Sequence, residues 1–251
     1  MDLDPVMRAE VRKLKEKGEN RKADSLMNAR SYHVDHGNGM DCYSVGATLG
    51  GGTAALMPDS AILYPHAYRK CEILDNGPLR FTARLTYAPF TLGKDTAITE
   101  TRLITLDQGS HLNRTEVSYE GLLTDVPVVT GIVIHPQNPD GYGFDREARY
   151  MAYADSTDCT TCGNGVVYIG AAFVSTPENI TLQRFDEKER KEHSGASGHL
   201  LGGSTYRPGS SYTYYWGSGW SKAGIESMEA WENYLKDYAR RLESPLQITY
   251  N

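Results

Sequence analysis

The sequence predicts a mainly β protein: an antiparallel β-sandwich with a charged helix at one end of the chain and an amphipathic helix at the other. First, many short alternating segments are separated by Gly, Asn and Asp turns. Second, no long helix lies between these segments, as a parallel α/β sheet would require. Third, 17 tyrosines and 3 tryptophans stand against 5 phenylalanines, and such amphipathic rings both pave sheets and stack on sugars. At 251 residues, one large domain accommodates all of this.

The N-terminal segment predicts helix. Residues 4–30 are rich in strong helix formers, and Pro5 suits an N-terminal helical position. Gly18 is expected to divide the helix, and its polar surface predicts a solvated or subunit-contacting arm. We therefore expect residues 1–30 to form a helical arm and residues 31–251 to form the β-sandwich domain.

Strand signals begin near Tyr68. The segment "RKCEILDNGPLRFTARLTY" predicts a hairpin that turns at residues 75–78, because its Asn-Gly pair supplies the positive φ of a tight turn. Two more strands are predicted in "TAITETRLITLDQGSHLNRTEVSYE", around residues 107–109. Further strands are predicted in "VPVVTGIVIH", "REARYMAYADS", "GVVYIGAAFV", "GHLLGGSTYR" and "SYTYYWGSGW".

The last predicted helix is "SMEAWENYLKDYARRLES". Its apolar residues recur at helical spacing, namely Met228, Trp231, Leu235, Tyr238 and Leu242. Ser227 can accept a first-turn amide, and Pro245 ends the helix. The following "LQITY" is expected to add a final strand.

Charge and cysteine content narrow the functional classes. A net charge of -6 and a pI of about 5.7 argue against nucleic acid as a partner, since such a groove needs clustered Lys and Arg. No apolar run approaches the roughly 18 residues that a membrane span needs. Cys159 and Cys162 lack a second close pair that would complete a zinc site, so either a local disulfide or two free thiols is predicted.

Residues 32–52, "YHVDHGNGMDCYSVGATLGGG", concentrate titratable side chains and 6 glycines. His33 and His36, flanked by Asp35 and Asp41, are expected on a loop that crosses a sheet. Four roles are open: a metal site, a structural tie within a tight loop, proton transfer, and ligand binding without chemistry. No established metal-ligand spacing is present, and we predict no metal and no cofactor.

We predict proton transfer as the role of this loop. His33 or His36 would be the general base or acid, because histidine changes charge near neutral pH. Asp35 or Asp41 would orient the imidazole, and Tyr43 would be the second proton-transfer group.

Substrate-binding candidates lie elsewhere in the chain. Arg69 is predicted to grip a carboxylate, because a guanidinium matches a carboxylate in geometry. Tyr215 and Trp216 of "YYWGSGW" are predicted to form a sugar-stacking wall, with packing as an equal alternative. His135, at a strand end, is a further candidate, although a structural role is favoured for it when it is taken singly.

Other polar and glycine-rich segments carry weaker signals. His66 is expected to be structural, and His193 and His199 to be solvated. The glycines of "SVGATLGGGTAAL" fit neither a P-loop nor a dinucleotide fingerprint, so we expect them to turn a corner or to let backbone approach a ligand.

Three segments carry a family resemblance: "YHVDHGNGMDCYSVGATLGGGTAAL", "YRKCEILDNGPLRFTARLTY" and "YYWGSGW". They resemble an uncharacterised bacterial family of polysaccharide-utilisation loci, often encoded beside unsaturated-uronyl hydrolases. The resemblance runs from Tyr32 to the C-terminus. It implies a β-sandwich like those of polysaccharide lyases and mutarotases, and a similarity to an oligosaccharide dehydratase of ulvan breakdown. Family members usually carry a further β-rich segment before "HVDHG", so we expect either that part of one sheet is missing from the domain or that a second chain or a homo-oligomer completes it.

The resemblance implies a β-eliminating enzyme that acts on uronic acid-containing oligosaccharides, preferably a dehydratase that forms a 4,5-unsaturated uronyl end. Two alternatives stay open, a non-catalytic carbohydrate-binding module and a mutarotase-like sugar epimerase. The resemblance also implies a periplasmic or secreted protein, although the chain as given shows no signal peptide.

Overall fold

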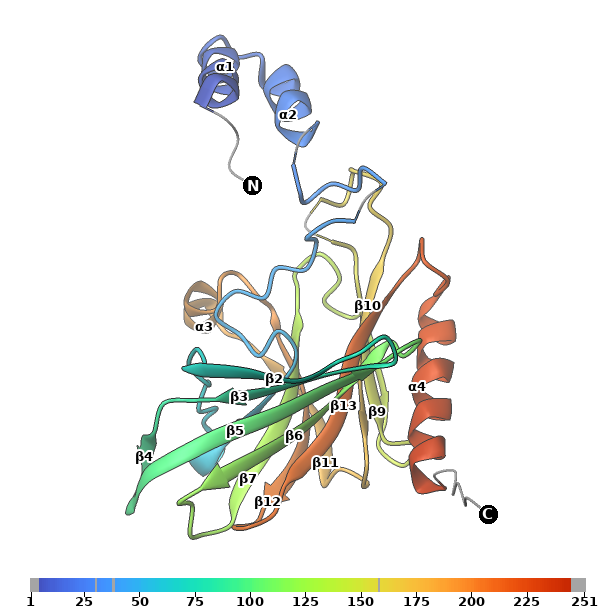
Figure 1. Cartoon of the computed structure of the whole chain (residues 1–251). Coiled ribbons are helices and arrows are strands. Elements are labelled where there is room, and N and C mark those ends of the chain that lie inside the picture. Colours follow the sequence, from blue (N-terminus) through green and yellow to red (C-terminus); the bar gives the residue numbers. More distant parts are fainter. Residues whose placement is uncertain (1–4, 30, 38, 158, 245–251) are drawn as a thin grey trace.

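The computed structural model describes residues 5–29, 31–37, 39–157 and 159–244, which form two β-sheets flanked by helices (Figure 1). Every strand pair among these residues is antiparallel. The two sheets are arranged like a sandwich, which confirms the predicted fold class.

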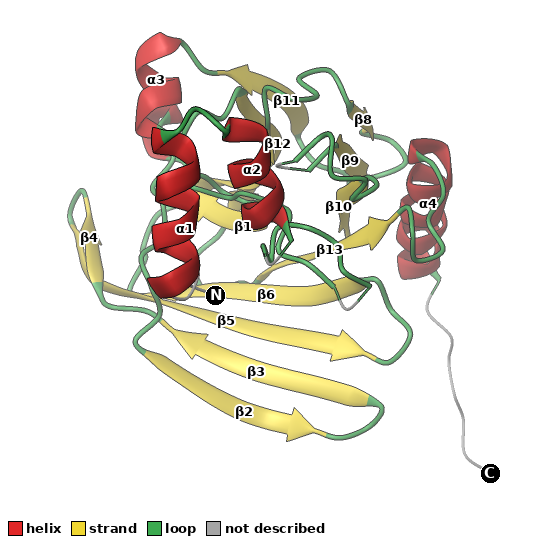
Figure 2. Ribbon diagram, turned by 90° about the horizontal axis from the view of Figure 1, so that it is seen from above, coloured by secondary structure: helices red, strands yellow, loops and turns green. Residues whose placement is uncertain are grey.

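The larger sheet has nine strands. Eight of them follow the order β2-β3-β5-β6-β13-β10-β9-β8, and β4 pairs with β5. Their bounds are β2 Lys70–Asn76, β3 Arg80–Thr86, β4 Phe90–Leu92, β5 Asp95–Asp107, β6 Leu112–Glu120, β8 Tyr142–Asp145, β9 Tyr150–Asp155, β10 Val167–Phe173 and β13 Tyr212–Trp220. Figure 2 shows β2 and β3 forming the outer edge of this sheet.

The smaller sheet has four strands in the order β1-β7-β12-β11. Their bounds are β1 Gly51–Leu56, β7 Val126–Ile134, β11 Asn179–Arg184 and β12 Gly198–Tyr206. β1 begins at the last glycines of the loop that the sequence singled out, so this sheet fixes the end of that loop.

The main hydrophobic core lies between the two sheets. Alternation along the strands turns Ile132 and Leu200 of the smaller sheet toward Val117 and Tyr214 of the larger one, and all four are buried. Gly52 of β1 has a φ of +126°, and a Cβ built there would lie 2.6 Å from the Trp216 Cβ. The glycine therefore lets β1 backbone approach a core side chain.

Helix α4 (Met228–Glu243) packs on the outer face of the larger sheet, beside β9 and β10 (Figure 1). Its predicted apolar stripe buries Trp231 and Leu235 completely. Gly170 of β10 lies beneath these two side chains, since a Cβ there would come within 2.7 Å of both. The Ser227 side chain accepts a hydrogen bond from the Ala230 amide, which confirms the predicted first-turn cap.

The N-terminal arm consists of α1 (Pro5–Glu16) and α2 (Asn20–Asn28), which stand apart from the sheets in Figure 1. Gly18 divides them, as predicted, with a φ of +74°. Met7, Val11 and Ala23 pack together between the helices and give the arm a small core of its own.

The predicted hairpins and the other predicted strands are present, and the final strand predicted in "LQITY" lies outside the described residues. The sequence missed β1, β4, β8, β11, the short helix α3 (Glu187–Glu192) and the 3-10 turn η1 (Pro58–Ser60). Cys159 and Cys162 form a disulfide, the first of the two predicted alternatives. Among the described helices, none is long and apolar enough to cross a membrane.

Candidate functional site

The two loop histidines are held by backbone carbonyls. His33 Nδ1 donates to the Asp41 carbonyl at 2.6 Å, and His36 Nε2 donates to the Ser31 carbonyl at 3.1 Å. Asn164, from the disulfide loop, donates to the His33 carbonyl at 2.8 Å. These contacts favour the structural alternative, a tight loop tied by its histidines, and the proton-transfer role stays a prediction.

The two loop aspartates, Asp35 and Asp41, stabilise the loop through hydrogen bonds. The Asp35 carboxylate accepts from Lys222 Nζ at 2.6 Å and from the Gly37 amide at 2.9 Å. The Lys222 hydrogen bond and the Gly37 amide lower the pKa of Asp35. Asp41 positions the His33 ring through its backbone carbonyl. The structure thus replaces the predicted carboxylate-to-imidazole orientation with a salt bridge that anchors the loop.

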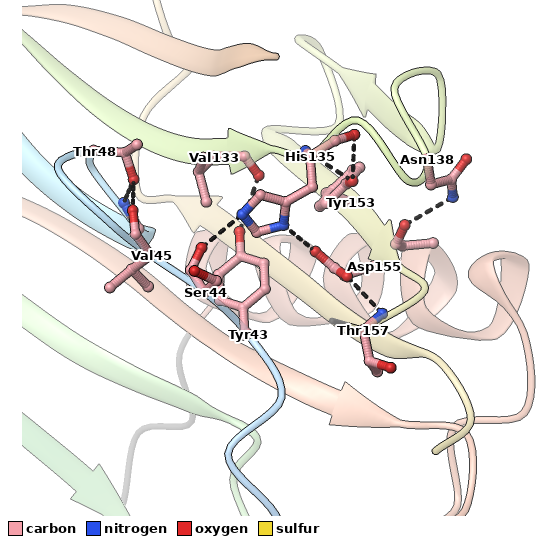
Figure 3. Close-up of polar contacts among 12 residues, drawn as sticks. Tyr43, Ser44, Val45, Thr48, Val133, His135, Asn138, Tyr153, Asp155 and Thr157 are labelled. Atoms are coloured by element: carbon pink, nitrogen blue, oxygen red, sulfur yellow. Dashed lines mark hydrogen bonds and ion pairs between the residues drawn. The ribbon is translucent and has the colours of Figure 1, made fainter. Parts of the chain in front are cut away.

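His135 and Tyr43 belong to a buried cluster (Figure 3). His135 Nδ1 contacts the Asp155 carboxylate, and Nε2 donates to the Ser44 carbonyl at 2.6 Å. The Tyr43 hydroxyl donates to the Val133 carbonyl at 3.0 Å. Burial raises the pKa of Tyr43 well above its usual value, so this phenol stays protonated.

His135 and Asp155, with their hydrogen-bond partners, support the loop structurally. His135 is 6% exposed and Asp155 is 1% exposed, and the second oxygen of Asp155 accepts from the Thr157 amide at 2.7 Å. Both ring nitrogens of His135 lie within hydrogen-bond distance of oxygen atoms, so the ring is held at both ends. The cluster ties the loop at Ser44 to the ends of β7 and β9. These contacts favour the structural role of His135, and the proton-transfer role of partly buried Tyr43 and the substrate-binding role of His135 stay predictions.

The remaining predicted residues do not converge. Arg69 lies just before β2 with an exposed side chain. Tyr215 packs against Tyr238 of α4 at a centroid distance of 5.1 Å. Trp216 points to the opposite face of β13, where its indole donates to Thr115 at 2.8 Å. Since successive strand residues face opposite sides, Tyr215 and Trp216 do not form one sugar wall.

A different set of residues does converge. A cavity of about 560 Å³ lies where the end of the 32–52 loop meets β1, β5 and the segment after α3. We call it the polar pocket. It is lined by Gly46, Ala47, Thr48, Thr53, Tyr64, Pro65, His66, Tyr87, Arg102 and His193. The glycine-rich loop thus reaches a cavity through residues 46–48, away from its histidines.

Arg102 supplies a fixed positive charge to the polar pocket. Its side chain is 7% exposed, and its Nε donates to Glu100, also 7% exposed, at 2.5 Å. Its Nη2 donates to the Ala54 carbonyl of the facing sheet at 2.7 Å. Among the described residues Nη1 has no hydrogen-bond partner, and it is not fully buried. Nη1 is therefore the guanidinium nitrogen left for a ligand in the pocket.

Burial and mutual attraction shift the pKa values of Glu100 and Arg102 in opposing ways. Burial raises the pKa of Glu100, and the Arg102 guanidinium partly offsets this rise. Burial disfavours the charged form of Arg102, but the Glu100 carboxylate together with nearby tyrosines keeps the pKa of Arg102 above its usual value. The Tyr87 ring lies 5.1 Å from the guanidinium carbon, which adds a cation–π contact. Glu100, the Ala54 carbonyl and the Tyr87 ring thus fix the position of the Arg102 guanidinium.

His193 lines the polar pocket, with its ring held by a hydrogen bond and by neighbouring rings. Its Nδ1 donates to the Ala47 carbonyl at 2.5 Å, which in the neutral ring leaves the lone pair on Nε2. The ring stacks on Phe185 at 4.5 Å and contacts Tyr64 at 5.4 Å. Neighbouring rings therefore fix the orientation of a potential base.

His199 lies behind this site and stays neutral. It is fully buried, which contradicts the prediction that it is solvated, and its Nε2 accepts from the Leu49 amide at 3.1 Å. Burial, reinforced by nearby His193, lowers the pKa of His199 to about 3. His199 therefore acts as a structural acceptor for the loop.

Tyr64 is the phenol nearest to His193. Burial, with a contribution from Glu189, raises the pKa of Tyr64 to about 12. Burial also raises the pKa of Tyr87, although Arg102 partly opposes this. Both phenols are proton donors at neutral pH. Arg102, His193 and Tyr64 together can bind a carboxylate and move protons. In the described ranges, no group of three or more His, Cys, Asp or Glu side chains is placed to hold a metal ion.

The comparisons with known proteins give a family and one relative. A family model described as a domain of unknown function, DUF4861, matches residues 6–248. Uncharacterized protein P7 of Formosa agariphila is 25% identical over 219 residues, which cover 87% of this chain and 51% of that protein. The chain therefore spans about half the length of the curated relative it matches.

Proposed function

The chain belongs to the DUF4861 family, and we propose that it is a β-eliminating enzyme that acts on uronic acid-containing oligosaccharides. Its polar pocket binds a terminal uronic acid and removes water across carbons 4 and 5. The observation that carries the proposal is Arg102, a buried side chain with one guanidinium nitrogen that has no hydrogen-bond partner among the described residues, in the lining of a cavity that His193 and the protonated phenol of Tyr64 also line.

Arg102 binds the substrate carboxylate. An ion pair with a guanidinium that is itself buried is stronger than one in water, because the local dielectric constant is lower. Removal of the proton at carbon 5 spreads negative charge onto that carboxylate, so a fixed guanidinium stabilises the enolate more than the substrate. Glu100 and the Ala54 carbonyl hold the guanidinium in place before substrate arrives.

His193 is the base and Tyr64 is the acid. Nε2 of His193 takes the proton from carbon 5, because its Nδ1 proton is held by the Ala47 carbonyl. The Tyr64 hydroxyl gives its proton to the departing oxygen on carbon 4. The electron pair of the broken C–H bond forms the new double bond as the C–O bond breaks and water leaves. Proton return from His193 to Tyr64 restores both groups.

The family context supports this reaction class through the resemblance described above. An unsaturated uronyl end is the substrate of the hydrolases that accompany such proteins in polysaccharide-utilisation loci. Placement of this chain in ulvan breakdown, and in a periplasmic or secreted location, belongs to the same proposal. The oligosaccharide substrate and the possible second chain are proposals as well, because the chain covers only 51% of its curated relative.

Product analysis tests the proposal. The protein is incubated with saturated uronyl oligosaccharides, and the ultraviolet absorbance of the conjugated double bond is followed beside product masses. Loss of one water per molecule is the expected result. Chain cleavage with the same absorbance indicates a lyase, binding without absorbance a carbohydrate-binding module, and faster anomer exchange by NMR a mutarotase-like enzyme.

A matched pair of arginine variants links the activity to the pocket. Arg102→Lys keeps the charge but cannot contact Glu100, the Ala54 carbonyl and a substrate at once, so activity falls. Arg69→Lys, at an exposed position outside the lining of the polar pocket, is the control and keeps full activity. Equal activity of the two variants contradicts the assignment of Arg102.

A further inference from the structure

A second cavity adjoins the polar pocket. It has a volume of about 160 Å³ and shares four lining residues with the polar pocket, Tyr64, Pro65, His66 and Tyr87. We call it the apolar pocket. A ligand whose carboxylate contacts Arg102 therefore has a neighbouring space on the other side of this common wall.

The lining of the apolar pocket sets the size and polarity of its ligand. Leu63, Pro89 and Phe90 supply hydrocarbon surface. An apolar cavity of about 150 Å³ holds a ligand the size of benzene. The pocket thus has room for about one ring or a short alkyl group.

The charges around the pocket exclude an anion. Glu100 lines the apolar pocket, whereas Arg102 lines the polar pocket and is absent from the apolar lining. The buried pair therefore presents its positive end to one cavity and its negative end to the other. A sulfate or a second carboxylate would meet the Glu100 side, so a neutral group is favoured.

Tyr119 leaves one polar group in the wall of the apolar pocket without a partner. It lines the pocket and is only 3% exposed, and its hydroxyl is buried without a hydrogen-bond partner among the described residues. Buried hydroxyls normally have a partner. Because this hydroxyl has almost no accessible surface, a sugar oxygen accepts its hydrogen bond only after neighbouring side chains move.

We propose that the apolar pocket is a second sugar-binding subsite, which takes the residue glycosidically linked to the uronic acid and selects a neutral group with an apolar surface, such as a deoxy or O-methylated sugar. The proposal rests on the proposed function, since the polar pocket must hold the uronic acid. It adds a substrate specificity: oligosaccharides with a charged neighbour at this position are poor ligands.

Calorimetry with two glycosides of one uronic acid tests the subsite. Methyl β-glucuronide fills only the polar pocket, and phenyl β-glucuronide adds a ring for the apolar pocket. Burial of about 55 Å² of apolar surface corresponds to roughly tenfold tighter binding. The wild-type protein is therefore expected to bind the phenyl glycoside about tenfold more tightly than the methyl glycoside.

Two variants fill or recharge the subsite without touching the polar pocket. Ala88→Phe occupies the space, and Leu63→Glu adds a second carboxylate at its rim. Leu79→Glu, at a 70% exposed position outside the apolar pocket, is the control for added charge. The phenyl preference is expected to disappear in the first two variants and to persist in the control.

The outcomes separate this inference from the proposed function. Equal binding of the two glycosides by wild type, or a phenyl preference that survives in both Ala88→Phe and Leu63→Glu, overturns the subsite and leaves the proposed function standing. Failure of wild type to bind either glycoside overturns the proposed function, and the subsite with it.

Discussion

Replacing Arg102 by methionine removes one partner of a buried arginine–glutamate ion pair, and the loss of stability should be large. Both side chains of the Arg102–Glu100 pair are 7% exposed. Arg102→Met leaves a buried carboxylate without its counter-ion and the Ala54 carbonyl without its guanidinium donor. Breaking such a pair costs about 3–5 kcal/mol. We expect the free energy of unfolding at pH 7 to fall by about this amount.

The pH dependence of this loss identifies its cause. Burial already raises the pKa of Glu100 above 4.5, and Arg102→Met removes the charge that opposes the rise. A raised folded-state pKa means that the penalty is present at high pH and disappears as the pH falls and Glu100 takes up a proton. The stability deficit of Arg102→Met should therefore shrink as the pH falls from 7 toward 4.5.

Urea unfolding of wild type, Arg102→Met and the double variant Glu100→Gln/Arg102→Met at pH 7 and pH 5 measures this effect. The double variant lacks the carboxylate, so its deficit should not depend on pH through Glu100 and should be smaller at pH 7. A deficit of the single variant below about 1 kcal/mol, the range of exposed pairs, would refute the buried pair. A deficit that does not change with pH would refute the unpaired carboxylate as its cause.

Three further predictions concern the loop and its supports. His199→Gln should flatten the acid limb of stability between pH 6.5 and 3, where wild type loses about 1.4 kcal/mol per pH unit because unfolded His199 binds a proton that buried His199 does not; an unchanged slope in urea titrations contradicts this. Gly52→Ala should destabilise by about 1–3 kcal/mol, because of its φ of +126° and its approach to Trp216, and a thermal shift near zero argues against that contact. His33→Ala and His36→Ala should lower thermal stability without changing product formation, and a hundredfold loss of rate in either would restore the proton-transfer role.

The fold was largely predictable because strand alternation and turn residues are local signals. The β2–β3 hairpin and the apolar stripe of α4 both follow from residues close together in the sequence, although the turn lies at residues 77–79 and Asn76 and Gly77 lack the predicted positive φ. β1 was missed because its first two residues, Gly51 and Gly52, continue the glycine-rich loop before it. The close approach of Gly52 to Trp216, a contact distant in sequence, explains the glycine there. β8 and β4 are only four and three residues long, too short to show a period.

The candidate site was not predictable in the same way. Arg102, His193 and Tyr64 come from three separate segments, and only the fold brings them to one cavity. One local signal did exist: Glu100 and Arg102 share the inward face of β5 with Ile98, where an alternating strand normally carries apolar residues. The 32–52 loop attracted attention by its density of titratable groups, but hydrogen bonds within the loop and to the body occupy most of them.

The rate of double-bond formation on a saturated uronyl disaccharide, measured for wild type, His193→Gln and His33→Gln, tests the central claim most directly. The claim places the base at His193, which lines the polar pocket and whose Nδ1 is held by the Ala47 carbonyl, so His193→Gln should be slower by roughly a hundred- to ten-thousand-fold. His33→Gln, in the carbonyl-bound loop, should match wild type. Full activity of His193→Gln beside an inactive His33→Gln would contradict the claim and return the chemistry to the loop.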